Sequence, residues 1–173
     1  ATFTVPASPA TQTGLDFGYK GTGTISGKIW YDVSGTGSAA QNPGDPGMSN
    51  VVLVALVDAN GNVIATTTST SDGSYSFANL PNGTYSITIN TATLPGGLIP
   101  SYDKDGIATA NKISVTIDAG QQNFTEGNFS YKGTASIGDL AWNDRDGNGS
   151  QNDGEPGLAG VKLSLTWAGF DGV

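Results

Sequence analysis

The sequence predicts an all-β protein, built from immunoglobulin-like or prealbumin-like β-sandwich modules in tandem. The first observation is a repeat: residues 15–21 return at 127–133, which aligns Tyr19 with Tyr131 at an offset of 131 − 19 = 112 residues. Self-similarity at the length of a small domain indicates an array of domains. The second is composition, since 26 Gly and 8 Pro in 173 residues disfavour helices. The third is a series of short apolar runs separated by turn residues.

Seven runs rich in β-branched and aromatic residues predict the strands of one complete module. Alternation supports them: Tyr75 and Phe77 share one face of their run, as do Tyr85 and Ile87 of theirs. The dipeptide Asn60-Gly61 between two runs predicts a hairpin with a type I′ turn. The segment 91–111 is predicted to be a long connection. In chain order, the runs are 25–31, 51–57, 62–68, 73–77, 84–90, 112–117 and 124–131.

The repeat also predicts the domain boundaries. The offset of 112 holds as far as Asp32, which aligns with Asp144. Beyond it the first copy carries two extra residues, Ala39 and Ala40, and the offset falls to 151 − 41 = 110. Residues 1–20 are then the last strands of a preceding module, 21–132 a complete module, and 133–173 the first strands of a following, truncated module. We therefore expect a piece of a longer repetitive protein, in which Tyr19 and Tyr131 have equivalent environments.

One predicted strand lacks the expected alternation. At an offset of 110, three apolar residues of 51–57 align with polar residues of 161–166. Two explanations are open: another part of the module covers them, or they form a surface for self-association with neighbouring copies, because monomers seldom expose contiguous apolar patches. The residues are Val52, Val54 and Leu56, aligned with Lys162, Ser164 and Thr166.

The segment 144–155 predicts a calcium site. It satisfies the pattern D-x-[DN]-x-[DN]-G-x5-E, in which alternate oxygen ligands, one backbone carbonyl and a distal carboxylate surround Ca²⁺. Modules of this kind bind calcium outside the cell at roughly 10⁻⁴–10⁻³ M. The predicted ligands are Asp144, Asp146, Asn148, Ser150, Asn152 and Glu155.

Two further acidic segments are weaker candidates for calcium. In the complete module Asp32 and Asp45 remain, but Ser34 and Thr36 replace two ligands. The pair Asp103 and Asp105 could add ligands if its turn folds against that loop. Alone, the pair indicates only a solvated turn.

Composition excludes several functions. The chain has no His and no Cys, so the usual catalytic bases and nucleophiles are missing and we expect no enzyme. A net charge of −8 repels nucleic acid and attracts divalent cations. No apolar run is long enough to cross a membrane, so we expect no membrane insertion in this segment.

Several motifs resemble one known family. GSYSFANLPNGTYSITI at 73–89, YDKDG at 102–106, and IGDLAWNDRDGNGSQNDGEPGLAGVKL at 137–163 are similar to the B-type domains of serine–aspartate-repeat surface proteins, relatives of the collagen-adhesin B domains. The resemblance implies an extracellular, cell-surface β-sandwich that binds calcium and stacks end to end. Some relatives carry a Lys–Asn isopeptide bond, for which Lys28 and Asn128 would be the pair. We expect none here, because no buried Glu is evident on a middle strand.

The sequence therefore predicts a structural repeat module of an extracellular stalk, adhesin or filament. Ca²⁺ and the short linker 132–135 would make it rigid, and its partners would be neighbouring copies of the module or chain. The alternative is a carbohydrate- or host-ligand-binding module, which needs exposed aromatic rings. The candidates for those rings are Trp30, Tyr31, Tyr102, Trp142 and Trp167.

Overall fold

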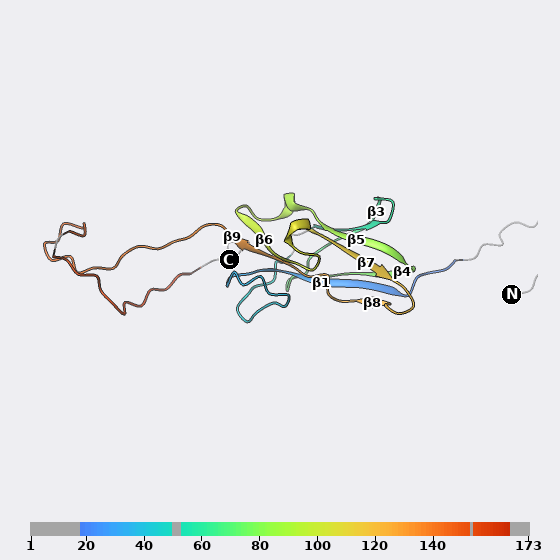
Figure 1. The fold of residues 1–173 in the computed structure, drawn as a ribbon, viewed down its shortest axis with the longest axis horizontal. Coiled ribbons are helices and arrows are strands. Elements are labelled where there is room, and N and C mark those ends of the chain that lie inside the picture. The colour runs from blue at the N-terminus through green and yellow to red at the C-terminus, as the bar shows by residue number, and fades with distance from the viewer. Residues whose placement is uncertain (1–17, 50–52, 153, 167–173) are drawn as a thin grey trace, which may run out of the picture.

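The computed structural model describes residues 18–49, 53–152 and 154–166. Its strands form two packed sheets, with β4-β1-β9-β6 in one (β8 pairs with β1) and β3-β2-β5-β7 in the other (Figure 1). The predicted all-β sandwich is confirmed. The elements are β1 (Gly23–Tyr31), β2 (Leu53–Asp58), β3 (Val63–Thr68), β4 (Ser74–Leu80), β5 (Gly83–Ile89), η1 (Thr91–Thr93), β6 (Leu98–Asp103), η2 (Ile107–Thr109), β7 (Lys112–Ile117), β8 (Asn123–Phe124) and β9 (Phe129–Gly133). In the described part of the chain, no helix is long and apolar enough to span a membrane.

The core lies between the two sheets and follows from strand alternation. On β1, Ile25 and Ile29 are fully buried; on β5, Ile87 is fully buried and Tyr85 nearly so. The buried residues of β1, β2, β4, β5, β7, β8 and β9 form one apolar cluster, against which Ala65 of β3 and Leu98 of β6 pack while partly exposed. Burial of each large apolar side chain contributes about 1.5–3 kcal/mol to folding.

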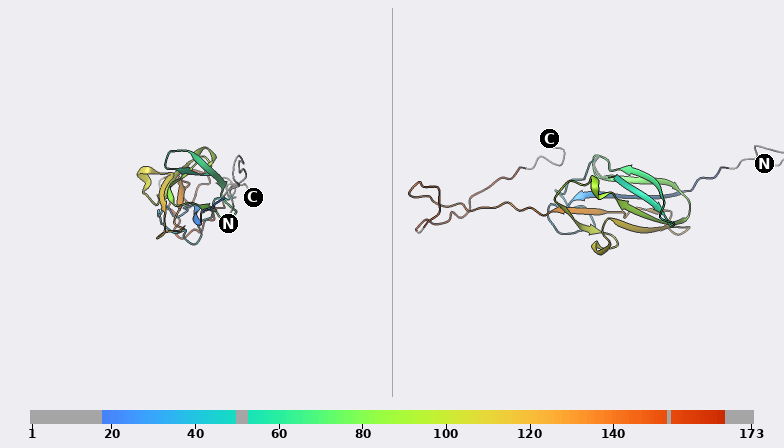
Figure 2. Two further views of the ribbon diagram at one scale, coloured as in Figure 1. Left: turned by 90° about the vertical axis from the view of Figure 1, so that its right-hand side faces the viewer. Right: turned by 90° about the horizontal axis from the view of Figure 1, so that it is seen from above.

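The chain enters and leaves the sandwich at opposite ends. It reaches β1 at one end, and it continues beyond β9 at the other (Figures 1 and 2). The first and last strands are nevertheless direct neighbours, because β1 pairs in parallel with β9 through Ile29–Phe129, Trp30–Ser130 and Tyr31–Tyr131. Tension along the chain therefore pulls β1 and β9 in opposite directions along their shared ladder.

Strand β6 lies inside the segment predicted to be a connection. Pro95, two glycines and Pro100 surround or interrupt it, and such residues signal turns. Pro100 is tolerated because β6 is the edge strand of its sheet, where one backbone N–H is not needed for pairing.

The predicted strand 124–131 is interrupted. It forms β8 and β9, and Gly127 lies between them. At this point the backbone of Gly127 approaches that of Gly27, and the hydroxyl of Tyr75 donates a hydrogen bond to the Gly127 carbonyl. The two glycines explain the break, because no side chain fits between the backbones.

The hairpin between β2 and β3 is confirmed, but its predicted turn type is wrong. Only Gly61 of the Asn60-Gly61 pair has a positive φ. The Asp58 carboxylate instead shapes the turn by accepting hydrogen bonds of 2.9 Å from the backbone N–H groups of Asn60 and Asn62. A side-chain acceptor of this kind replaces the geometry that a type I′ turn would need.

The alignment predicted that Val54 and Leu56 face outward, and this prediction is wrong. Both are fully buried in the core, so they cannot form the proposed self-association surface; Val52 lies outside the described residues. A one-residue shift in register moves every side chain of a strand to the other face. An offset of 163 − 54 = 109 instead aligns Val54 with Leu163 and Leu56 with Leu165, so that the buried positions of both copies are apolar.

We therefore expect Val54→Ser to destabilise the sandwich rather than weaken association. Removing an apolar side chain from the core and burying a hydroxyl should lower the free energy of unfolding by about 2–4 kcal/mol. Chemical denaturation measures this change, and Val63→Ser on an exposed position of β3 is the matched control. Equal stability of the two variants would contradict the assigned register.

Residues 134–166 form no described strand. Their one ladder contact is a bridge between Trp142 and Gly157. Ile137, which aligns with fully buried Ile25, is 80% exposed, and Tyr19 is 93% exposed although Tyr131 is buried. The expected equivalence of Tyr19 and Tyr131 is therefore absent in this structure. A strand needs neighbours on its edges, and the described residues beside these segments supply none.

Candidate metal centre

Three carboxylates converge in the segment 144–155. Oxygen atoms of Asp144, Asp146 and Glu155 all lie within 4.8 Å of one another. Within the ranges that the structure describes, no second group of three acids gathers in this way. Clustered carboxylates repel one another unless a cation lies between them, and hard oxygen ligands suit Ca²⁺. The donor set therefore fits the predicted ion.

Backbone hydrogen bonds hold the loop around these acids. Asp144 accepts from the N–H groups of Gly147 (2.8 Å) and Gly149 (3.0 Å), which have positive φ and allow the chain to bend. Glu155, although distant in sequence, accepts from the N–H groups of Arg145 (2.8 Å) and Asn152 (3.1 Å). The backbone of the loop itself thus positions both acids.

The remaining predicted ligands lie close to this cluster. Asn148 and Asn152 donate from their side-chain amides to Asp146, at 2.7 Å and 3.1 Å, and Ser150 donates its N–H to the Asn148 side chain. The hydrogen bond from Asn152, with others, lowers the pKa of Asp146. The carboxylate therefore stays charged at pH values below its ordinary pKa, and its contribution to stability is lost only as pH falls through the lowered pKa.

The loop of the complete module, residues 32–45, has the same backbone arrangement. Asp32 accepts from the N–H of Gly37 at 2.8 Å, and Asp45 accepts from those of Val33 and Asn42 at 3.1 and 3.2 Å. Burial raises the pKa of Asp32, but hydrogen bonds from Gly37 and others outweigh it, so the pKa is lowered overall. Asp45 therefore corresponds to Glu155 in spite of its different side chain.

Asp103 and Asp105 do not join either loop. Asp103 is buried, and it accepts from the N–H groups of Asp105 (3.1 Å) and Lys112 (3.3 Å). Asp105 accepts from the N–H of Ser114 at 2.7 Å. Burial raises the pKa of Asp103 despite these hydrogen bonds. The pair thus fastens the connection between β6 and β7.

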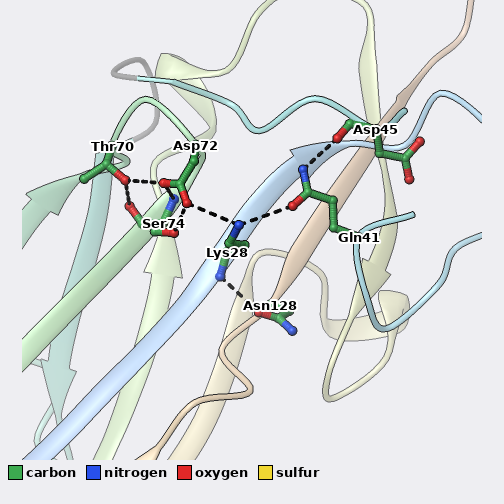
Figure 3. Close-up of polar contacts among 7 residues, drawn as sticks. All are labelled: Lys28, Gln41, Asp45, Thr70, Asp72, Ser74 and Asn128. Carbon is green, nitrogen blue, oxygen red and sulfur yellow. Dashed lines mark hydrogen bonds and ion pairs between the residues drawn. The ribbon is translucent and has the colours of Figure 1, made fainter. Parts of the chain in front are cut away.

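The side chains of Lys28 and Asn128 are directed to other partners (Figure 3). The Lys28 ammonium lies 3.2 Å from Asp72 Oδ2 and donates to Gln41 Oε1 at 3.4 Å. The Asn128 side chain accepts from the backbone N–H of Lys28 and donates to the Ala39 carbonyl. This arrangement does not bring the Lys28 ammonium to the Asn128 amide for a crosslink.

Trp30 is unsuited to bind sugars. It is 1% exposed, and its ring stacks on Tyr102 with centroids 6.4 Å apart. Ser130, paired with Trp30 on the neighbouring strand, is small and leaves room for this stacking. Trp142 is only partly buried, and Trp167 lies outside the described residues. Trp30 thus packs on Tyr102, and its backbone bridges to Gly47, just after the 32–45 loop.

Sequence reasoning missed the role of two amide residues. Gln41 donates to the Asp45 carbonyl at 2.6 Å, and Gln151 donates to the Glu155 carbonyl at 3.2 Å. The signal was present, because the dipeptide Gln-Asn occurs at 41–42 and again at 151–152. In both loops, the glutamine side chain thus donates a hydrogen bond to the backbone carbonyl of the last acidic residue.

The fold and the two loops define a tandem β-sandwich module with a carboxylate cluster at the start of its next copy. The SdrD B-like domain profile matches residues 23–129 and 135–171. The chain belongs to this family, as the sequence motifs predicted, and the expected extracellular, cell-surface location follows from that membership.

Curated relatives share about a third of the aligned residues. The chain is 36% identical to serine-aspartate repeat-containing protein F of Staphylococcus epidermidis over 168 residues, 94% of this chain and 9% of the relative. It is 33% identical to Colossin-A of Dictyostelium discoideum, covering 87% of this chain and 1% of that protein, and 33% identical to serine-aspartate repeat-containing protein D of Staphylococcus aureus strain Newman, covering 79% and 10%. The chain thus spans a tenth or less of these relatives.

Two solved structures with a similar fold are pilins. The major pilin BcpA of Bacillus cereus is 18% identical with a TM-score of 0.44, over 66% of this chain and 31% of that one. The minor pilin GBS52 of Streptococcus agalactiae is 12% identical with a TM-score of 0.45, over 70% and 49%.

Proposed function

We propose that this chain is a load-bearing structural segment of an extracellular stalk, adhesin or filament, with neighbouring copies of the module as its partners. The parallel pairing of β1 with β9, combined with chain entry and exit at opposite ends, is the observation that supports it most. Tension loads the hydrogen bonds of the ladder together, in shear, rather than one at a time. No catalytic step is part of this function.

Calcium has a mechanical role in this proposal. The first two residues of the predicted linker 132–135, Lys132 and Gly133, belong to β9. Thr134, the next residue, is fixed by hydrogen bonds from its N–H and hydroxyl to the Gly97 carbonyl. A cation among Asp144, Asp146 and Glu155 would neutralise their repulsion and hold the following loop in one shape. Calcium would thereby stiffen the connection between successive modules.

Proteolysis of the loop tests the role of calcium. Arg145 is the single arginine of the chain and lies inside the loop, so trypsin cleavage there reports on loop opening. We expect a chelator to raise cleavage at Arg145 at least about fivefold, because local opening controls cleavage. Cleavage at exposed Lys20 in the same digest is the control for direct effects on trypsin. Equal ratios of the two cleavages with and without calcium would contradict calcium stiffening.

A further inference from the structure

The two loops share one framework but have different side chains in its centre. We name residues 32–45 the first loop and residues 144–155 the second loop. The backbone bond from Tyr31 to the Pro46 carbonyl (2.9 Å) recurs from Asn143 to Pro156 (3.0 Å). The two carboxylates that begin and end each loop also accept equivalent backbone N–H groups. The framework therefore forms with either set of central side chains.

In the first loop, hydroxyl groups replace the ligands at the third and fifth positions. Ser34 Oγ and Thr36 Oγ1 lie 3.1 Å apart, within hydrogen-bond distance. The Asn42 amide donates to Thr36 Oγ1 at 3.0 Å and to Ser34 Oγ at 3.4 Å. Asn152 has the same position in the second loop, where its amide reaches the Asp146 carboxylate. Asn42 thus joins two neutral side chains in place of two metal ligands.

A second contact, shown in Figure 3, holds the first loop onto β1. The Lys28 ammonium donates to Gln41 Oε1, and the other end of the Gln41 amide donates to the Asp45 carbonyl. Lys28 is itself held by Asp72. At the position of Lys28, the second copy has Leu140, whereas it keeps the glutamine as Gln151. A lysine at this position of the strand therefore accompanies only the first loop.

The electrostatic demands of the two loops differ accordingly. The second loop collects three carboxylates that repel one another. The first loop has two, Asp32 and Asp45, and every oxygen of both accepts a hydrogen bond from a backbone N–H. The end carboxylates of the second loop accept backbone N–H groups in the same way. The loops therefore differ by the third carboxylate, Asp146, whose position the uncharged Ser34 takes in the first loop, so the first loop has less negative charge for a cation to neutralise.

We propose that the first loop is a metal-free lock, in which Asn42 and the Lys28–Gln41 contact hold the shape that calcium holds in the second loop. The stability of the complete module is then independent of calcium, and only the copy after it responds to the ion. The contrast between the two loops rests on the proposed binding of calcium by the second loop, whereas the metal-free state of the first loop does not. Asn42 and Lys28 are positioning residues of the lock.

The first test uses the variant Asp144→Asn/Asp146→Asn, in which the second loop no longer binds calcium. We expect calorimetry to give the same unfolding midpoint of the sandwich in 1 mM calcium and in chelator. Within that background, Asn42→Ala should lower the midpoint by about 4–8 °C, because it removes the hydrogen bonds to Thr36 and Ser34, and calcium should not restore it. Asn152→Ala, at the equivalent position of the second loop, is the control and should leave the midpoint unchanged.

The second test restores a metal site. Ser34→Asp combined with Thr36→Asn gives the first loop the side chains of Asp146 and Asn148, and should make the sandwich midpoint rise with calcium. Calcium binding by the unmodified first loop, or an Asn42→Ala midpoint equal to that of its background, would overturn the proposal. Failure of the intact second loop to bind calcium would instead contradict the proposed function and leave the lock standing.

Discussion

Gly27→Ala should unfold the module or destabilise it severely. A Cβ atom at Gly27 would lie 1.9 Å from the carbonyl oxygen of Gly127, and both groups belong to backbones that cannot rotate aside. Separating them would break the contact between β1 and the segment that joins β8 to β9. We expect the free energy of unfolding to fall by about 3 kcal/mol or more, which corresponds to roughly 10–20 °C in the melting temperature.

Gly96→Ala is the matched control for this substitution. A Cβ atom at Gly96 meets no atom within 4 Å, and its φ is not positive. Its melting temperature should therefore remain close to that of the unmodified chain, within about 0.5 kcal/mol of stability. Similar melting temperatures for the Gly27 and Gly96 variants would contradict the close approach of the Gly27 backbone to the Gly127 backbone.

Asp146→Asn should weaken calcium binding by about tenfold or more. The substitution preserves the shape and one acceptor oxygen of the side chain, but it removes one of three negative charges that converge within 4.8 Å. The affinity of such loops depends on the number of charged ligands. Isothermal titration calorimetry at millimolar calcium measures the change.

Asp139→Asn provides the control for net charge. Asp139 is exposed and lies shortly before the loop, and among the described residues its carboxylate accepts one hydrogen bond, from the N–H of Leu140. It should bind calcium as the unmodified chain does. Equal weakening by the two substitutions would mean that calcium is attracted by overall charge and is not coordinated by the loop.

The strands could be predicted from the sequence where apolar and polar residues alternate clearly. They could not be predicted where tertiary contacts determine whether a segment forms a strand or where the strand ends. The run 112–117 is strand β7 with the predicted bounds. Strand β6 was missed because Pro100 is compatible with a strand only at an edge, and edge position depends on the order of strands in the sheet. The break at Gly127 follows from its approach to Gly27, a contact between residues 100 positions apart.

In the candidate site, too, features set by residues close in sequence could be predicted, and features set by tertiary contacts could not. The spacing of acids predicted the cluster of Asp144, Asp146 and Glu155, because its ligands are close in sequence. The prediction placed Val54 and Leu56 on the wrong face because the alignment kept the offset of 110 through residues 51–57 and had no further gap of one residue there. The contact between Lys28 and Gln41 joins a strand to a loop, so local patterns contain no signal for it.

The load-bearing role is tested most directly by pulling single molecules in two directions. Because the chain has no Cys, introduced cysteines can serve as unique handles. In the first geometry, handles before Gly23 and after Gly133 load β1 and β9 in shear. In the second geometry, the second handle is moved to exposed Asn82, so that the force opens the antiparallel β1–β4 pair from the end where Gly23 pairs with Leu80. The account predicts a several-fold higher rupture force in the first geometry, after which the 133 − 23 + 1 = 111 unfolded residues can extend to roughly 370–400 Å. Equal forces in both geometries, or a lower force in the first, would contradict it.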